Sequence, residues 1–394
     1  MKIDEVKVKN FKSLKDVDLK LSNLTLITGV NSSGKSTFIQ SLLLLKQNQE
    51  TLKTISNSKI FEKSYVAKEQ DKALFDAYNK ILEDTKKLTF SFNGDYVELG
   101  NKKDILNQDT FLEDISFELI IQNNMSYKVF CSSSTALIKI ESKVPMETLF
   151  NLFSEDFQYI STNRISPNIT YPLSELNIEK NLIGIKGEYT AHYLAVNRHQ
   201  SLKINKLIHP SSKTNQLLEN VSLWLGEISN GIDISAKVYN ELQQVNLTYN
   251  YIYGDNKSNE FTPLNVGFGI TYVLPIIVAV LKSKPDDLLI IENPESHLHP
   301  AGQSKIAELC AIASSQGVQI IIETHSDHFL NGIRVATKKE ILKPESSQIY
   351  YFRKEKNELE TKIDKLNIDK NGKIDEWPIG FFDEWDNKLD ELLW

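Results

Sequence analysis

The stretch LTLITGVNSSGKS, residues 24–36, decides the fold of this chain. Its first five residues are apolar or β-branched, which predicts a buried strand. Residues 29–36 match G-x-x-x-x-G-K-[ST] in full, and residues 36–49 have helical spacing. A chance match to the whole pattern in this chain is expected on the order of 0.01 times. The stretch therefore predicts a strand, a glycine loop and a helix in direct succession.

This loop has the residue types that bind phosphate. Gly29 and Gly34 allow backbone angles that point successive N–H groups into one concavity. The helix from Lys35 presents its positive dipole end, Lys35 supplies a charge to the β- and γ-phosphates, and Ser36 can bind Mg²⁺. A glycine loop that only caps a helix is the alternative. We expect the triphosphate of ATP to be bound by Asn31, Ser32, Ser33, Gly34, Lys35, Ser36 and Thr37.

A second strand ends in acidic residues. Residues 287–295 read DLLIIENPE, which is an apolar run, a carboxylate and a turn at Pro294. A carboxylate at the carboxyl end of a parallel strand lies beside the phosphate loop in P-loop folds, where it holds the water shell of Mg²⁺. Glu292 is therefore the candidate metal residue together with Ser36, and Glu295 is a second acid. The alternative is an ordinary strand end.

Three histidines follow these strands. His297 and His299 lie two apart, but a short turn without cysteine cannot supply three or four converging ligands, so we favour a structural or interface loop. His325 follows the strand predicted at residues 319–323 and could reach the γ-phosphate of a bound nucleotide. A structural role is the alternative for His325.

Composition limits the class of protein. Apolar residues make up 41% and charged residues 25% of the 394 residues, which excludes a wholly disordered or fibrous chain. The net charge of −7 excludes a uniformly basic nucleic-acid coat. Cys131 and Cys310 are too few for a disulfide framework, so we expect reduced, buried thiols. The most apolar run, residues 272–281, is half of the ~20 residues that cross a bilayer, so we expect a cytoplasmic protein without membrane contact.

The pattern along the chain predicts an interrupted α/β core. Residues 50–85 have helical spacing and many charges, and residues 88–140 suggest an antiparallel meander. Helices are expected at residues 215–228, 267–282, 300–316 and 326–340, and a hairpin of strands at residues 236–262.

These motifs together resemble the ABC-type ATPases of the RecF/SMC group, and in particular bacterial ATPases akin to the overcoming-lysogenization-defect (OLD) proteins. Residues 29–36 match the group's Walker A loop, and residues 290–300 resemble its Walker B strand and D-loop. Residues 323–326 resemble the switch-histidine segment, and residues 265–271 a degenerate signature motif. Further similar segments are residues 8–14, 159–164 and the tail WPIGFFD at 377–383.

The resemblance implies an α/β P-loop NTPase of the ABC-ATPase head type, with a β-rich lobe and a helical insertion. Its core would comprise residues 1–49 and 159–340, interrupted by a helical and β-rich insertion at 50–158. Residues 341–394 would form a C-terminal hairpin and an aromatic helix, too short for the nuclease domain of some relatives. We therefore expect no intrinsic nuclease.

The resemblance also implies a mechanism. A homodimer or higher homo-oligomer would enclose ATP and Mg²⁺, and Gly267 and Gly269 of one subunit would complete the γ-phosphate site of the other. Hydrolysis would then require dimerisation. The implied catalytic positions are Glu292, Asn293, Glu295 and His325.

The chain departs from the group at two places. Asn293 stands where the group has its catalytic glutamate, and the signature lacks Ser-Gly-Gly. Asparagine cannot act as a base, so either Glu295 contributes or turnover is slow.

Three functions follow from these observations. The first is a Mg²⁺-dependent ATPase that controls a separately encoded, nuclease-like effector in anti-phage defence. The second is a nucleotide-locked scaffold with little turnover, which Asn293 favours. The third is an ATP-dependent protein that binds duplex DNA in repair through lysines near the N-terminus and at 203–213; a solvated face is the commoner meaning of such runs.

Overall fold

The computed structural model describes residues 1–65, 83–84, 87–110, 113–121, 125–142, 150–356, 358–378, 380–382 and 384–393. The chain divides into two compact units, each assembled from three segments. Unit 1 comprises Met1–Leu21, Ser32–Ser154 and Arg353–Lys362. Unit 2 comprises Ser22–Asn31, Glu155–Phe352 and Ile363–Trp394. The predicted domain boundaries stay a prediction.

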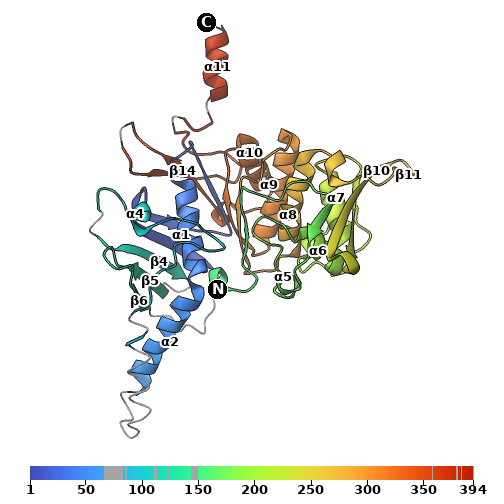
Figure 1. The fold of residues 1–394 in the computed structure, drawn as a ribbon. Helices are drawn as coiled ribbons and strands as arrows, with labels where there is room; N and C mark the ends of the chain where they lie inside the picture. Colours follow the sequence, from blue (N-terminus) through green and yellow to red (C-terminus); the bar gives the residue numbers. More distant parts are fainter. Residues whose placement is uncertain are drawn as a thin grey trace. The chain divides into compact units, whose positions relative to one another are not determined.

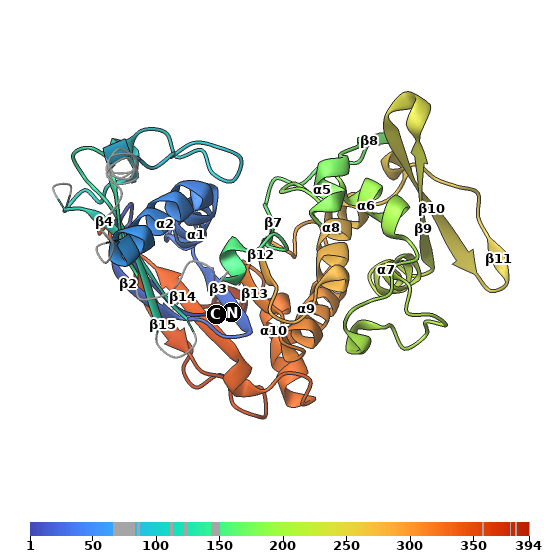
Figure 2. The ribbon, with the colours of Figure 1, turned by 90° about the horizontal axis from the view of Figure 1, so that it is seen from below.

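Unit 2 is built on a six-stranded sheet with the order β15-β14-β3-β13-β12-β7; β14 is labelled in Figure 1 and all six strands are labelled in Figure 2. The strands are β3 (Leu24–Gly29), β7 (Gln158–Ile160), β12 (Leu288–Glu292), β13 (Gln319–Glu323), β14 (Ser347–Arg353) and β15 (Lys362–Leu366). The pairs from β14 through β3, β13 and β12 to β7 are parallel. Glu323 lies opposite Ile27 and Glu292 lies opposite Glu323. The carboxyl ends of β3, β13 and β12 therefore meet at one edge of the sheet.

Three helices stand beside this sheet. They are α8 (Phe268–Lys282), α9 (Pro300–Ser315) and α10 (Asp327–Lys338), and they confirm the helices predicted there. α9 packs against β13, β3 and α10, and α8 packs against β12 and β7 (Figure 2). All five residues of β12 and of β13 are buried. Strands that are buried on both faces consist of continuous apolar runs, and this pattern made β12 and β13 predictable from the sequence.

A second, antiparallel sheet completes unit 2. It contains β8 (Thr170–Pro172), β9 (Ile232–Tyr239), β10 (Gln244–Tyr253) and β11 (Asn256–Lys257), and β9 with β10 forms the predicted hairpin. Helices α6 (Thr190–Asn197) and α7 (Leu217–Gly226) pack against β9. The connections contain α5 (Glu175–Glu179) and the short 3₁₀ turns η3 (Asn205–Leu207), η4 (Asn240–Leu242), η5 (Pro263–Asn265) and η6 (Pro344–Ser346).

Unit 1 holds a five-stranded antiparallel sheet in the order β2-β1-β4-β5-β6. The strands are β1 (Ile3–Phe11), β2 (Leu14–Lys20), β4 (Ile115–Ile121), β5 (Met125–Cys131) and β6 (Ile138–Ser142). The unit also contains α1 (Lys35–Gln47), α2 (Gln49–Tyr65), α4 (Lys102–Ile105) and η2 (Asn151–Phe153). Helix α1 packs against β1 and α2 packs against β6. The rest of the helical segment predicted at 50–85 lies largely outside the described residues.

The first part of the predicted meander differs from the expectation. Residues 88–101 make only isolated bridges between turns and α4 follows them, while β4 to β6 form the expected strands. The end of α1 supplies the missing partners. The side-chain oxygen of Gln47 accepts hydrogen bonds from the N–H groups of Tyr96 (3.2 Å) and Val97 (3.0 Å), and that of Asn48 from Ser91 (2.7 Å). Side-chain amides thus replace a neighbouring strand.

The C-terminal region ends in a hairpin and a helix. An antiparallel bridge joins Ile368 to Ile374 around Gly372, which confirms the expected turn, and α11 (Glu384–Leu393) follows. Phe381 is buried against Tyr351, at 5.2 Å between ring centres, whereas Trp377 is half exposed under Arg334. Part of the aromatic tail therefore packs onto the core. None of the described helices is both long and apolar enough to span a bilayer.

Candidate functional site

Two glycines set the path of the phosphate loop. Gly29 ends β3 with a φ of +142°, and a Cβ there would lie 2.0 Å from the carbonyl oxygen of Phe352 on β14. Gly34 begins α1 with a φ of +104°, and a Cβ there would lie 2.3 Å from the hydroxyl of Thr361. Ser32 also has a positive φ, of +61°. Both glycines are therefore required by the local backbone, as the sequence predicted.

The start of α1 favours an anion. Its cap residue is glycine, which has no side-chain acceptor, and its first turn contains no acidic residue. The positive end of a helix dipole binds phosphate best where no carboxylate competes. Lys35 is buried at 3% exposure, whereas Asn31, Ser32 and Ser36 are exposed. The helix start and Lys35 thus supply positive charge beside accessible polar side chains.

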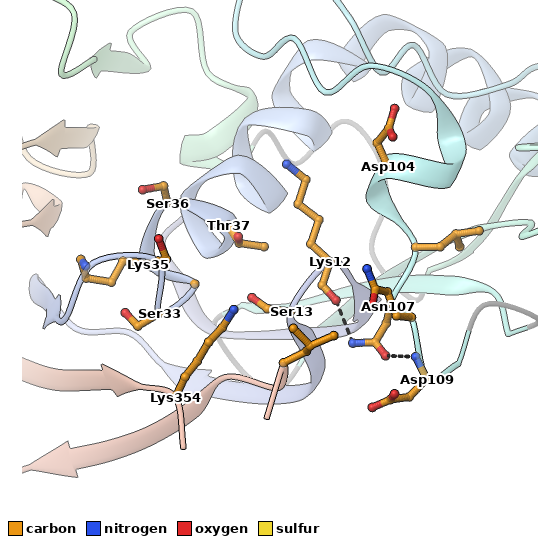
Figure 3. Close-up of a pocket in the computed structure, with 15 residues that line it drawn as sticks. Lys12, Ser13, Ser33, Lys35, Ser36, Thr37, Asp104, Asn107, Asp109 and Lys354 are labelled. Carbon is orange, nitrogen blue, oxygen red and sulfur yellow. Dashed lines mark hydrogen bonds between the residues drawn. The ribbon is translucent and has the colours of Figure 1, made fainter. Parts of the chain in front are cut away.

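A cavity of about 410 Å³ opens beside this loop within unit 1 (Figure 3). Its walls include Ser32 to Thr37, the β1–β2 turn, and the segment around α4. Asn107 fixes one side: its amide donates to the carbonyl oxygen of Lys12 (2.7 Å) and its side-chain oxygen accepts from the N–H of Asp109 (3.0 Å). The volume lies in the range of small-molecule sites. Lys12, Ser13, Asn107 and Lys354 were not among the predicted site residues.

Glu292 ends β12 at the sheet edge of unit 2. Its carboxylate accepts hydrogen bonds from the hydroxyl (2.9 Å) and the N–H (3.4 Å) of Thr162. Burial raises the pKa of the neighbouring Tyr159 hydroxyl, and the charge of Glu292 adds to the effect. Tyr159 therefore stays protonated. The predicted metal residue is thus a carboxylate oriented by Thr162.

A buried arginine supports the turn after β12. Arg164 is 2% exposed, and one of its amino groups donates to the carbonyl oxygens of Glu292 and Asn293, the latter at 2.9 Å. Its guanidinium lies 5.5 Å from the ring centre of Tyr272. Burial lowers the pKa of Arg164 to about 10, a shift that the charge of Glu295 opposes. Arg164 thus remains charged at neutral pH and fixes the backbone that carries Glu292.

The other three predicted catalytic positions lie around the same edge. Asn293 has a φ of +45°, and its N–H donates to the carbonyl oxygen of Glu323 (2.8 Å). Its buried side-chain oxygen has no hydrogen-bond partner among the residues that the structure describes. Glu295 accepts from the hydroxyl of Thr324 (2.7 Å) and from the N–H of His325 (2.8 Å). Glu295 thus holds the exposed His325 in place with both carboxylate oxygens.

The segment predicted as a signature motif contacts the segment predicted as a D-loop within unit 2. Gly269 lies in the first turn of α8, and a Cβ there would come within 2.3 Å of the carbonyl oxygen of His297. The ring of His297 packs against Phe268 (4.7 Å) and Tyr272 (4.9 Å). His299 accepts from the N–H of Ala301 at the start of α9 (3.3 Å). Both histidines thus make local contacts within unit 2, and no metal-binding cluster occurs in the described part of the chain.

Residues 1–330 match the family model described as an AAA ATPase domain, which is most of the chain. The chain belongs to the AAA ATPase domain family. Residues 342–392 of this AAA ATPase match a second family, described as a protein of unknown function (DUF3696). None of the curated proteins matches it.

Solved structures of SMC heads are similar to this AAA ATPase. One is an Smc head bound to the C-winged helix domain of ScpA, at 12% identity and a TM-score of 0.51, over 93% of this chain and 98% of that chain. Another is the SMC head domain from Thermotoga maritima, at 12% identity and a TM-score of 0.44, over 93% and 100%. The first likeness confirms the predicted P-loop ATPase fold. With the phosphate loop, family membership makes the chain a nucleotide-binding AAA ATPase domain.

Proposed function

We propose that this AAA ATPase domain binds ATP with Mg²⁺ at the phosphate loop and hydrolyses it. The single observation that carries the proposal is the sheet edge of unit 2. There β3, which leads into the loop, ends beside β13, which ends in Glu323, and β13 in turn ends beside β12, which ends in Glu292. A phosphate loop and an acidic strand end in this order are the two parts that nucleotide hydrolysis with Mg²⁺ needs.

The donor set suits Mg²⁺, which prefers oxygen ligands and retains several waters. Ser36 offers an exposed hydroxyl, and Glu292 offers a carboxylate that Thr162 orients. When bound, Mg²⁺ neutralises charge on the phosphates. In this proposal Lys35 and the N–H groups at the start of α1 hold the phosphate tail.

We further propose an ATP-joined homodimer, in which Gly267 and Gly269 complete the partner's site. Leu264 and Phe268, beside the start of α8, are 57% and 42% exposed. Large apolar side chains that stay exposed next to a functional segment are typical of contact surfaces. Light scattering with Mg²⁺ and ATP should show the dimer, and Phe268→Ala should weaken it.

The second candidate function, a nucleotide-locked scaffold, has support from two residues. Asn293 replaces the catalytic glutamate of the RecF/SMC group, and both carboxylate oxygens of Glu295 already accept hydrogen bonds. These two hydrogen bonds join Glu295 to the segment that carries His325, so we assign Glu295 to the positioning of His325 rather than to proton transfer. We therefore expect slow turnover.

Steady-state ATP hydrolysis with binding measured in parallel tests the proposal. Lys35→Ala should lose both binding and hydrolysis, whereas Glu292→Gln should keep ATP binding and lose hydrolysis. Glu295→Gln should slow hydrolysis through His325 without abolishing it. If the wild type binds ATP tightly but hydrolyses it no faster than Lys35→Ala, the scaffold is the function. If the wild type does not bind ATP, both candidates are refuted.

The biological setting that we propose is control of a separately encoded, nuclease-like effector in anti-phage defence. The support is the resemblance of the sequence motifs to the OLD proteins. The DNA-repair alternative has weaker support, because N-terminal lysines pair with acids: Lys7 with Glu5 (2.8 Å) and Asp18 (3.2 Å), and Lys9 with Asp16 (2.9 Å). Absent or salt-insensitive duplex binding would reject it.

A further inference from the structure

The C-terminal region forms part of unit 1 through one short segment, Arg353–Lys362. This segment lies within residues 342–392, the match to the family of unknown function, and outside the AAA match at 1–330. Two of its side chains, Lys354 and Leu359, line the 410 Å³ cavity beside the phosphate loop. The cavity therefore has a wall that the ATPase family model does not include.

Thr361 connects this segment to the phosphate loop. Its N–H donates to the carbonyl oxygen of Ser13 at 3.0 Å. Its hydroxyl oxygen lies 2.8 Å from both the carbonyl oxygen of Ser33 and the hydroxyl of Ser13. The side chain is buried at 5% exposure and fills the space that a Cβ at Gly34 would need. Thr361 thus fixes the loop against the β1–β2 turn.

Lys354 brings a positive charge to the same cavity. Among the described residues its ammonium group has no hydrogen-bond or ion-pair partner, whereas the adjacent Arg353 pairs with Glu355 at 3.1 Å. In Figure 3 the Lys354 side chain extends toward the loop at Ser33. The two carboxylates of the cavity are engaged elsewhere: Asp104 accepts from the N–H of Asn101 (2.7 Å) and Asp109 lies 4.0 Å from Lys15.

We propose that Lys354 binds the phosphate tail of the nucleotide and that Thr361 is a positioning residue that holds the phosphate loop in its binding conformation. The C-terminal region then senses the bound nucleotide, because a segment that strengthens binding is itself stabilised by the ligand to the same extent. This inference rests on the proposed function, since it takes a triphosphate as the occupant of the cavity.

Calorimetry with two probes, Mg²⁺-ATP and inorganic tripolyphosphate, tests the role of Lys354. Lys354→Ala should lower the affinity for each probe by about 10-fold, which is the effect expected from the loss of one hydrogen bond to a charged group. Lys354→Arg should restore most of the affinity. Lys356→Ala removes the same charge from an exposed neighbour that does not line the cavity, and it should bind both probes like the wild type.

The outcomes separate this inference from the proposed function. If Lys35→Ala abolishes binding while Lys354→Ala binds both probes like the wild type, the inference is wrong and the proposed function stands. If Lys354→Ala loses affinity for ATP but not for tripolyphosphate, the phosphate contact is also refuted, because tripolyphosphate has neither sugar nor base. If the wild type binds neither probe, the proposed function fails and the inference fails with it.

Hydrogen exchange tests the sensing. In the wild type, ATP should slow amide exchange in residues 353–362, and this protection should be absent in Lys35→Ala. Thr361→Val should lower ATP affinity by about 10-fold and Thr361→Ser should retain it, because only the serine keeps the hydroxyl. Unchanged exchange in the wild type at saturating ATP would overturn the sensing role.

Discussion

Gly34→Ala should destabilise unit 1 through two separable effects. An alanine at a φ of +104° costs about 1–3 kcal/mol in backbone strain. The new Cβ, 2.3 Å from the hydroxyl of Thr361, must also displace that group from Ser33 and Ser13, at about 1 kcal/mol for each hydrogen bond. We therefore expect the free energy of unfolding to fall by about 4 kcal/mol in total.

A double-mutant cycle checks this reasoning. Thr361→Ala alone should cost about 2 kcal/mol, because it removes the same two hydrogen bonds. In the Gly34→Ala background it should cost almost nothing, since those bonds are already broken, which gives a coupling of about 2 kcal/mol. Gly254→Ala is a matched control: its φ is +59° and nothing lies within 4 Å of the added Cβ, so only about 1–2 kcal/mol of strain is expected.

Urea unfolding of the four proteins of the cycle and of the control gives the required free energies. If the losses in free energy of unfolding of Gly34→Ala and Thr361→Ala add in the double mutant, the claim that the added Cβ and the Thr361 hydroxyl compete for one space is refuted. A Gly34→Ala protein as stable as Gly254→Ala would refute the claim that the loop is closely packed.

The remaining predictions concern buried groups. Arg164→Ala should lower the free energy of unfolding by about 3 kcal/mol in urea, because the backbone carbonyls beside it lose a charged donor; an unchanged midpoint would contradict this. Burial raises the pKa of Asp287 to about 6 from 3.8, so stability from its protonation is present at low pH and lost as the pH rises through 6. The free energy of unfolding of Asp287→Asn, measured relative to the wild type, should therefore rise by up to about 3 kcal/mol between pH 4 and pH 7. A difference between the two proteins that does not change with pH would contradict this prediction. Burial raises the pKa of Cys131 and Cys310 to about 12, so iodoacetamide at pH 8 should label both thiols only after denaturation.

The sequence predicted the parts of the fold that local patterns specify. The phosphate loop was predictable because its two glycines, lysine and serine lie within eight residues. Strands β12 and β13 were predictable because burial on both faces requires continuous apolar runs. Residues 88–101 were not, because the N–H groups of Ser91, Tyr96 and Val97 donate to the side chains of Gln47 and Asn48, and no periodicity records such a contact.

The sequence predicted only those residues of the candidate site that directly follow a recognisable strand. Glu292, Glu295 and His325 follow strands and could be named from their place in the chain. Arg164 and Thr162 precede Glu292 by more than a hundred residues, and only parallel pairing of β7 with β12 brings them to it. Thr361 reaches the loop over a still longer separation, and a lone threonine carries no pattern that would point to it.

The position of β3 in its sheet has a consequence for synthesis on the ribosome. Residues 24–29 leave the exit tunnel early, yet both strands that pair with them, residues 319–323 and 347–353, are made about three hundred residues later. At about 5–20 residues per second, the growing chain carries this apolar strand without either neighbour for roughly 15 to 65 s. During this interval the apolar residues of β3 lack the two strands that bury them, and exposed apolar surface of this kind makes a growing chain prone to aggregate.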